Sequence, residues 1–412
     1  MLKPLTVLFL LAPVAAQAFS QCALTDIGGP GAHIAEEGSN PVISGQWAYA
    51  AFAQDTKVSI LVASANGATQ LPLYTIANGK GTTSNVRLAA AGSHAYVTWQ
   101  QGGETDHHLW LAVSADHGRH WGAPEDLGPA SHALQQIFAD GSNVHLAFIG
   151  SKGHATALSS SDNGKTFGPA ADLGRSSGEV VMTSHAQNVY VAWEIGRTSD
   201  EPGIGFGYSH DGGKTFTVDD ISRNGSRQAH EPILSLNQKN GRLSLIWREH
   251  EPTQGVYLQS LDNGVSWSTP VVIDTDSRQF MVQDNGPTIF VSYLKEYMIN
   301  NKPDWQVQLA VSKDGGLTFP FVQNLSGPTG VSQIVGDNSR PVPWSISGKI
   351  VLTGVAADGA YIWSGDRGRI TSDKVYLGPG ELASPQGQVA LWEEPEGVIT
   401  FAYCTDGNPK KR

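Results

Sequence analysis

The chain has 412 residues, including 47 glycines and 22 prolines, and only 16% of its residues are charged. This composition is typical of a turn-rich globular protein and excludes a coiled coil or an acidic disordered chain. The 27 Lys and Arg residues against 38 Asp and Glu residues give a formal net charge of -11. That balance argues against nucleic acid or an anionic membrane as a partner, because both bind basic surfaces.

The N-terminus has the pattern of a secretory signal. Lys3 is followed by an apolar stretch from Leu5 to Val14 and by the small residues Ala16 and Ala18 around Gln17. A positive charge, an apolar run and a small-x-small site in this order are typical of signal peptides. We expect residues 1–18 to be cleaved off near Ala18 and the mature chain, 19–412, to be secreted or periplasmic. No later stretch reaches the roughly 18 apolar residues of a membrane span, so we expect no membrane insertion.

One pattern, Ser-x-Asp-x-Gly-x-x-aromatic, recurs along the mature chain. Its five close copies occupy residues 114–121, 160–167, 209–216, 260–267 and 312–319. In a tight turn, Ser and Asp side chains can bind backbone groups, while Gly takes the position that needs a positive φ. We therefore predict five hairpin turns, called the repeat turns below, with structural Asp residues at Asp116, Asp162, Asp211, Asp262 and Asp314.

Strand patterns surround the repeat turns. A short alternating strand precedes the turn, at 109–113, 205–208 and 255–258. A stronger strand precedes that one, at 95–99, 144–148, 189–193, 243–247 and 289–293. Another strand follows the turn, at 124–127 and 170–173. The unit is a four-stranded antiparallel meander that recurs roughly every 45–50 residues, and it predicts an all-β, single-domain β-propeller over 19–412.

Weaker copies of the turn decide the expected number of blades. They lie at 64–67, 364–368 and 404–407 and bring the number of expected third strands to eight. The last unit has no outer strand of its own, but residues 23–27 resemble the outer strands that end at Leu127 and Leu173. We predict eight blades, with a ring that the N- and C-terminal strands close without a free edge. Seven blades with an irregularly packed last segment are the alternative.

The two cysteines fit this closure. Cys22 begins the N-terminal strand, and Cys404 ends the C-terminal strand predicted beside it. We predict a disulfide between them because an exported cysteine pair oxidises readily. The bond would close a loop of nearly the whole mature chain and contribute up to about 5 kcal/mol in the simple entropic picture. Two unrelated free thiols are the alternative.

The repeat turns resemble the Asp boxes (BNR repeats) of the sialidases and related propeller proteins, and the resemblance covers nearly the whole mature chain. Asp boxes occur in propellers of many functions, so they indicate the fold and leave the activity open. In sialidases, three Arg residues bind the substrate carboxylate, a Tyr paired with a Glu is the nucleophile, and an Asp is the acid/base. We expect ligands on the face with the second-to-third-strand loops and the connections between blades, opposite the repeat turns.

One segment of the chain matches the sialidase site well. His230 and Glu231 begin an inner strand, and Arg248 ends the next strand. The resemblance implies that Glu231 is the catalytic partner of the nucleophile and that Arg248 binds a carboxylate, with His230 beside them as a ligand-binding residue. A structural ion pair between Glu231 and Arg248 is the alternative.

The remaining sialidase residues match poorly. Residues 39–44, where the family has its first Arg, contain none, so Arg87 in the next blade is the substitute. Arg340 is a candidate for another carboxylate-binding residue, with a solvated loop position as the alternative, and Asp106 is the candidate acid/base. Where the family has its Tyr, this chain has Ser384 and Pro385. The resemblance therefore implies an incomplete catalytic set.

No metal or cofactor is predicted. The pairs His107 with His108 and His117 with His120 are expected on opposite faces, so they cannot share a four-ligand site. We interpret the chain as an exported, monomeric, sialidase-like propeller that binds a glycan, an anionic sugar or another extracytoplasmic ligand on its central face. The alternatives are an exo-acting glycoside hydrolase of sialidase type with a rearranged active site, and a protein-interaction scaffold.

Overall fold

The computed structural model describes side chains between residues 41 and 328, except at 65–68, 77–80, 104–105, 132–134, 197–201, 223–227 and 251. Strands within 21–33 and 342–405 are described by their backbone. The predicted signal sequence and Arg340 lie outside the described residues. The described part of the chain is all-β, as predicted, and it contains no helix long and apolar enough to cross a membrane.

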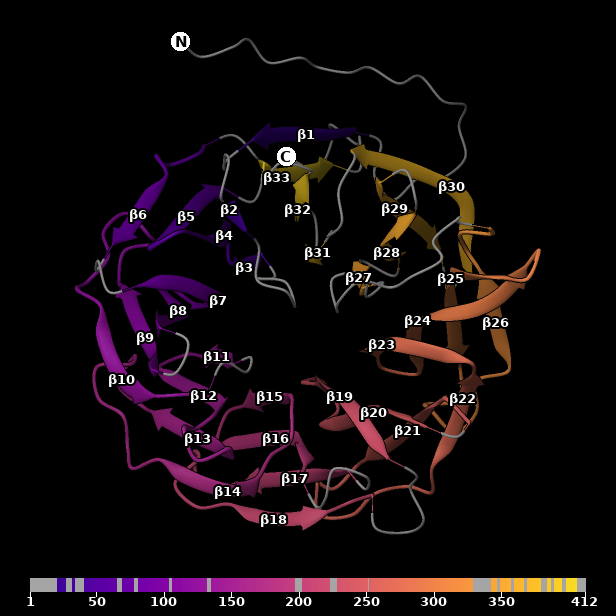
Figure 1. Cartoon of the computed structure of the whole chain (residues 1–412), viewed down its shortest axis with the longest axis horizontal. Coiled ribbons are helices and arrows are strands. Elements are labelled where there is room, and N and C mark those ends of the chain that lie inside the picture. Colours follow the sequence, from indigo (N-terminus) through magenta and orange to yellow (C-terminus); the bar gives the residue numbers. More distant parts are fainter. Residues whose placement is uncertain are drawn as a thin grey trace.

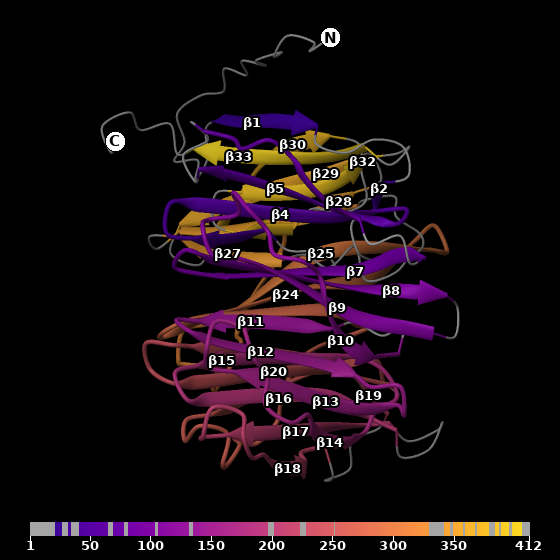
Figure 2. The same cartoon turned by 90° about the vertical axis from the view of Figure 1, so that its left-hand side faces the viewer.

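The strands form antiparallel sheets that stand around a common axis (Figure 1). Within a sheet, strands that follow one another in the chain are hydrogen-bonded neighbours, so each sheet is a meander running outward from the axis. Figure 2 shows the strands crossing the thickness of the ring, so the turns lie at its two faces. The predicted propeller of four-stranded antiparallel meanders is confirmed.

Each sheet has an inner, a second, a third and an outer strand. The inner strands are β3 (Val42–Ser44), β7 (Thr82–Ala91), β11 (Gln136–Asp140), β15 (Val180–His185), β19 (Ala229–Asn237), β23 (Ser277–Asn285), β27 (Val342–Ile346) and β31 (Ser384–Gln386). The second strands are β4 (Trp47–Gln54), β8 (His94–Gly103), β12 (Asn143–Ile149), β16 (Asn188–Ile195), β20 (Arg242–Glu249), β24 (Thr288–Ile299), β28 (Lys349–Ala356) and β32 (Val389–Glu394).

Next come the third strands, five of which lead into the repeat turns. They are β5 (Lys57–Ser64), β9 (Asp106–Ser114), β13 (His154–Ser160), β17 (Gly203–Ser209), β21 (Gln254–Ser260), β25 (Lys302–Ser312), β29 (Gly359–Asp366) and β33 (Val398–Thr405). The outer strands are β6 (Tyr74–Ala77), β10 (Glu125–Pro129), β14 (Ala171–Arg175), β18 (Thr217–Asp220), β22 (Val271–Thr275), β26 (Phe321–Asn324), β30 (Arg369–Gly378) and β1 (Gln21–Asp26). A short strand, β2 (Ala32–His33), also pairs with β4.

The core lies between neighbouring sheets. The second strands from β4 to β24 are largely buried on both faces, and each places an aromatic side chain there, such as Trp99, Trp193 and Trp247. One cluster joins Val97 and Trp99 to Tyr49 and Val62 of the preceding sheet. Burying a side chain of this size contributes about 2–3 kcal/mol. The apolar side chains on both faces of the second strands therefore hold the sheets against one another.

The repeat turns are closed by their own Ser and Asp side chains. In the turn at 260–267, Ser260 Oγ donates to Asp262 Oδ1 at 2.8 Å and accepts the N–H of Gly264 at 2.9 Å. The same two bonds recur in the other four turns. Hydrogen bonds from the Ser266 side chain and backbone and from Ser260 lower the pKa of Asp262 to about 2. The carboxylate is thus held in its charged form, which accepts these bonds.

The glycine of each repeat turn packs against the preceding sheet. Gly264 has a φ of 86°, and a Cβ there would lie 2.8 Å from Phe206 Cε1. At Gly316, with a φ of 92°, a Cβ would lie 2.6 Å from Tyr257 Oη. The turn therefore requires glycine for two reasons, its left-handed backbone and the close wall of the neighbouring sheet.

The two ends of the described chain meet in one sheet. Strand β1 pairs antiparallel with β33, next to the start of the ring (Figure 1). The register sets Cys22 directly opposite Cys404. Directly opposed residues in an antiparallel pair have Cα atoms about 4.5–5.5 Å apart, which a disulfide can span. The predicted disulfide itself involves side chains outside the described set and stays a prediction.

Candidate functional site

The repeat turns identify the two faces of the ring. The N–H of His117, in a repeat turn, donates to the carbonyl of Ser93, in the first-to-second-strand turn of the same sheet, at 2.8 Å. Asn163 binds Ser142 in the same way in the next sheet. These two kinds of turn therefore share one face, called the turn face. The second-to-third-strand loops and the connections between sheets form the other, called the loop face.

Inner strands carry an irregularity near the loop face that re-aims their polar side chains. The register of β7, β19 and β23 shifts at Asn85, Glu231 and Gln279. These residues have φ values of 51°, 54° and 56°. A left-handed backbone costs a non-glycine residue about 1–2 kcal/mol. Bulges of this kind are common beside functional sites, where they redirect a side chain.

Glu231 and Arg248 form a close ion pair across β19 and β20. Arg248 donates from Nε at 3.0 Å and from Nη2 at 2.6 Å, both to Glu231 Oε1. The two side chains are only 19% and 12% exposed. Glu231 Oε2 is buried and accepts no hydrogen bond from the described residues. The sequence pattern correctly predicted that these two residues lie side by side. It left open whether they form part of a ligand site or a structural ion pair.

Two histidines and a second glutamate extend this pair into a network. Glu194, from the preceding sheet, accepts the backbone N–H of Glu231 at 2.8 Å and lies 3.6 Å from His230 Nδ1. Arg248 Nη1 donates to His250 Nε2 at 2.7 Å. Because a guanidinium has no acceptor, His250 must present a lone pair there. Burial, and then the charge of Arg248, lower the pKa of His250, which keeps this ring neutral.

Arg278, on the next inner strand β23, contributes a second guanidinium. Its charge also lowers the pKa of His250, which places it within electrostatic range of the network. The guanidinium lies over the Trp305 ring at 4.6 Å from the centroid. Among the described residues, Arg278 has no carboxylate partner, and its Nε is buried without an acceptor. We call Glu231, Arg248, His230, His250 and Arg278 the inner cluster.

Arg87 occupies a different part of the ring. It lies on β7, in the second sheet, whereas Glu231 lies on β19, and two further sheets stand between them along the chain. Its side chain is 95% buried, and Nη1 donates to the carbonyl of Val86 at 3.2 Å. The described contacts of the inner cluster come from β16, β19, β20, β23, β25 and their loops, and none of them involves Arg87.

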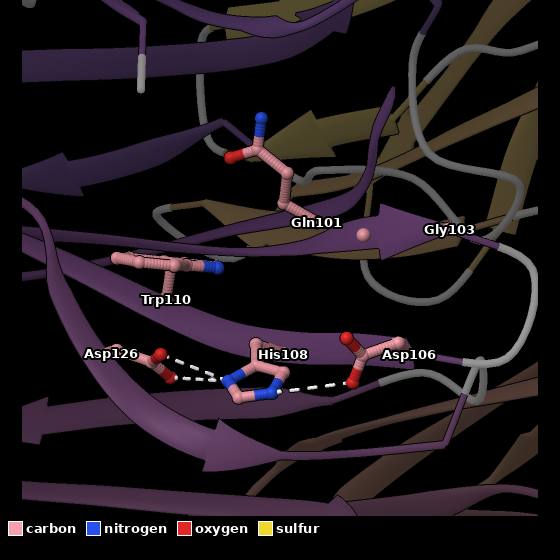
Figure 3. Close-up of a pocket in the computed structure, with 7 residues that line it drawn as sticks. Gln101, Gly103, Asp106, His108, Trp110 and Asp126 are labelled. Atoms are coloured by element: carbon pink, nitrogen blue, oxygen red, sulfur yellow. Dashed lines mark hydrogen bonds and ion pairs between the residues drawn. The ribbon is translucent and has the colours of Figure 1, made fainter. Parts of the chain in front are cut away.

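Asp106 lies in a pocket of about 290 Å³ at the loop-face end of β8 and β9 (Figure 3). Figure 3 shows Asp106 and Asp126 on opposite sides of the His108 ring. His108 Nδ1 donates to the two carboxylate oxygens of Asp126 at 2.8 and 2.9 Å, while Nε2 lies 3.5 Å from Asp106 Oδ1. The pocket is lined by Gln101, Gly102, Gly103, Asp106, His108, Trp110 and Asp126. Asp106 thus belongs to β9, three sheets before Glu231.

Sequence reasoning missed several members of both groups. His250, Glu194 and Arg278 had no motif to identify them, because they meet Glu231 only through the packing of neighbouring sheets. His108 was considered only as half of a histidine pair, and its real partner, Asp126, lies on the next strand of the same hairpin. No three His, Cys, Asp or Glu side chains in the described residues are arranged to hold a metal ion.

Comparison with known proteins supports the fold. No family model and no curated protein sequence matches the chain. A PL25 ulvan lyase, a polysaccharide lyase solved with bound -[GlcA(1-4)Rha3S]-, superimposes with a TM-score of 0.52 at 14% identity over 85% of this chain and 96% of the lyase. The polysaccharide lyase Uly1 gives a TM-score of 0.52 at 10% identity over 90% of each chain. Trypanosoma rangeli sialidase gives only 0.41 at 10% identity, over 83% of this chain and 57% of the sialidase, too distant for an inference.

Proposed function

We propose that this chain is an exported, eight-bladed Asp-box propeller, closed by β1, that binds an acidic glycan at the inner cluster on its loop face. The observation that carries the proposal is the ion pair of Arg248 with Glu231, joined by His230 and His250, with the Arg278 guanidinium of the next inner strand within electrostatic range. The lyase structures with the same fold add support, since one of them holds a glucuronate-containing saccharide. The signal-like N-terminus would bring the protein to such a ligand.

The charges of the inner cluster favour a carboxylate ligand. Arg248 is neutralised by Glu231, whereas Arg278 has no carboxylate partner among the described residues. A sugar carboxylate could pair with Arg278, and sugar hydroxyls could donate to Glu231 Oε2, which accepts no other described bond. Because the site is partly buried, such charge-assisted bonds are stronger there than in bulk water.

Calorimetric titration with an oligosaccharide of glucuronate and sulfated rhamnose tests this proposal, with a neutral gluco-oligosaccharide as the control ligand. Arg278→Gln should weaken binding at least about tenfold, the usual effect of losing one charged hydrogen bond. Arg242→Gln is the matched control, because Arg242 stands at the turn-face end of β20 and pairs with buried Asp284. It should lower stability and leave affinity unchanged. Equal affinity for both ligands, or no binding at all, would reject the site and favour a protein-interaction scaffold.

A second candidate function is cleavage of the bound chain by β-elimination. It is favoured by the free Oε2 of Glu231, a buried carboxylate oxygen that could take a proton from the carbon next to a uronate carboxylate. The electron pair left behind would form a carbon–carbon double bond as the glycosidic C–O bond breaks, and water would protonate the leaving oxygen. Arg278 would stabilise the charge that develops on the carboxylate.

The same substrate tests this activity. Absorbance of the unsaturated uronate product should rise with the mature protein and should not rise with Glu231→Gln, while Glu231→Gln should still bind. Sialidase-type hydrolysis is expected to be negligible. The short inner strand β31 carries Ser384 and Pro385, with no Tyr to act as nucleophile. Release of product from an activated sialoside, lost in Glu231→Gln, would contradict this expectation and support the rearranged glycoside hydrolase.

A further inference from the structure

The pocket around His108 is a separate candidate site, because it lies in another sheet from the inner cluster. We propose that it binds the primary ammonium group of a hydroxylated ligand of monosaccharide size, as in a hexosamine without its N-acetyl group. The proposal does not depend on the inner cluster. The pocket around His108 has a volume of about 290 Å³, near the lower limit for small-molecule pockets. This size suits a single sugar ring.

The charge of the pocket selects a cation. Among the described residues, its lining contains two carboxylates and one imidazole, and no Lys or Arg. An anionic group would be repelled there, whereas an ammonium group would be attracted. The described residues offer no metal-binding group of three His, Cys, Asp or Glu side chains, so the geometry favours an organic cation.

Asp126 orients the His108 ring toward the ligand position. A carboxylate only accepts, so His108 Nδ1 must donate to Asp126, and Nε2 faces Asp106. In the neutral form of an imidazole that donates through Nδ1, Nε2 carries a lone pair. An ammonium group carries three N–H donors. It could therefore donate to His108 Nε2 and to an Asp106 oxygen at once. The wall of the pocket beside them is Trp110, which stacks on Trp99 and presents an apolar surface to a sugar ring (Figure 3).

The next sheet contains the same histidine–aspartate pair. His154 Nδ1 lies 2.9 Å from both carboxylate oxygens of Asp172, and Asp172 Oδ1 also accepts the N–H of Gly174 at 2.9 Å. Asp126 binds Gly128 in the same way. The pair by itself is therefore a repeated structural element of the outer hairpin.

The extended loop-face end of the β8–β9 hairpin is what distinguishes the pocket from that repeated pair. Gly102 lets the chain close tightly, since a Cβ there would lie 1.8 Å from the carbonyl oxygen of Asp106. This end of the hairpin brings Asp106 opposite His108 Nε2. In the next sheet, the shorter connection after Ile149 turns back at Gly150 and Gly153.

Calorimetric titration with D-glucosamine tests the proposal, with N-acetyl-D-glucosamine, D-glucose and cadaverine as comparison ligands. We expect glucosamine to bind at least about fivefold more tightly than each of the others, since each lacks either the ammonium group or the hydroxylated ring. Asp106→Asn should weaken the binding of glucosamine about threefold. The effect is modest because the Asp106 side chain is 86% exposed.

Asp126→Asn and Asp172→Asn form a matched pair of variants. Both remove the carboxylate from a histidine–aspartate pair of the same geometry, so both should lower the melting temperature by a similar amount. Only Asp126→Asn should weaken glucosamine binding. Equal binding of glucosamine and N-acetyl-D-glucosamine, binding of cadaverine as tight as glucosamine, or an unchanged affinity in Asp126→Asn would each overturn the proposal.

Discussion

His145 makes the stability of the ring depend on pH. The side chain lies on β12 and is 99% buried, with Nδ1 in a hydrogen bond to Ser159 Oγ at 2.9 Å. Its Nε2 has no hydrogen-bond partner in the described residues. The repeat turn of the following sheet covers this corner, because a Cβ at Gly213 would lie 2.0 Å from Ser159 Oγ. A proton on His145 would therefore be held away from water.

Burial lowers the pKa of His145 from 6.5 to about 4, although the charge of Asp140 opposes this shift. As pH falls below the unfolded value, the unfolded chain takes up a proton that the folded chain does not, so the free energy of unfolding falls. The fall ends near pH 4, where both states are protonated. Because each pKa unit corresponds to about 1.4 kcal/mol, the total loss is about 3 kcal/mol.

Urea unfolding, followed by circular dichroism, measures this loss at several pH values between about pH 7 and about pH 4. The comparison is with His145→Gln, which cannot gain a proton and leaves the other titrating groups in place. Wild type should lose about 3 kcal/mol more than the variant over this range. Parallel pH dependences for the two proteins would refute the assignment, whatever their absolute stabilities.

Two other predictions follow from the packing and the pairing of the strands. Gly264→Ala should cost about 2–4 kcal/mol, since it adds a contact with Phe206 to an unfavourable backbone. Gly141→Ala, with a φ of 58° and open space around it, should cost only about 1 kcal/mol in the same thermal unfolding assay, and equal costs would contradict the contact. Mass spectrometry of the exported protein should find Cys22 bonded to Cys404, and reduction should lower the melting temperature; two free thiols under non-reducing conditions would rule out the bond.

The repeat turns were predictable because their interactions are local. Ser260, Asp262 and Gly264 satisfy one another within a few residues, so their chemistry is visible in the spacing of the sequence. The second strands were predictable because both of their faces are buried, which gives them short, strongly apolar runs. From these two features, the order of strands within a meander follows directly.

The inner cluster could be predicted only in part. Glu231 and Arg248 stand on adjacent strands of one hairpin, where the sequence pattern can pair them. Glu194 and Arg278 come from the sheets on either side, and their approach depends on bulges at Glu231 and Gln279 whose positive φ values no propensity favours. Contacts between sheets leave no periodic signal in the sequence, so this part required the three-dimensional structure.

The contact between each turn glycine and the sheet before it also determines how the ring can be rearranged. The walls that the repeat turns meet differ along the ring: Val62 faces Gly118, Phe206 faces Gly264, and Tyr257 faces Gly316. A meander copied into another position would therefore meet an unsuitable neighbour, even though its own strands pair correctly. Stability should consequently be distributed over nearest-neighbour junctions, as in repeat proteins. Cutting the chain between sheets and joining its ends elsewhere should preserve those junctions, whereas exchanging or duplicating a single meander should not.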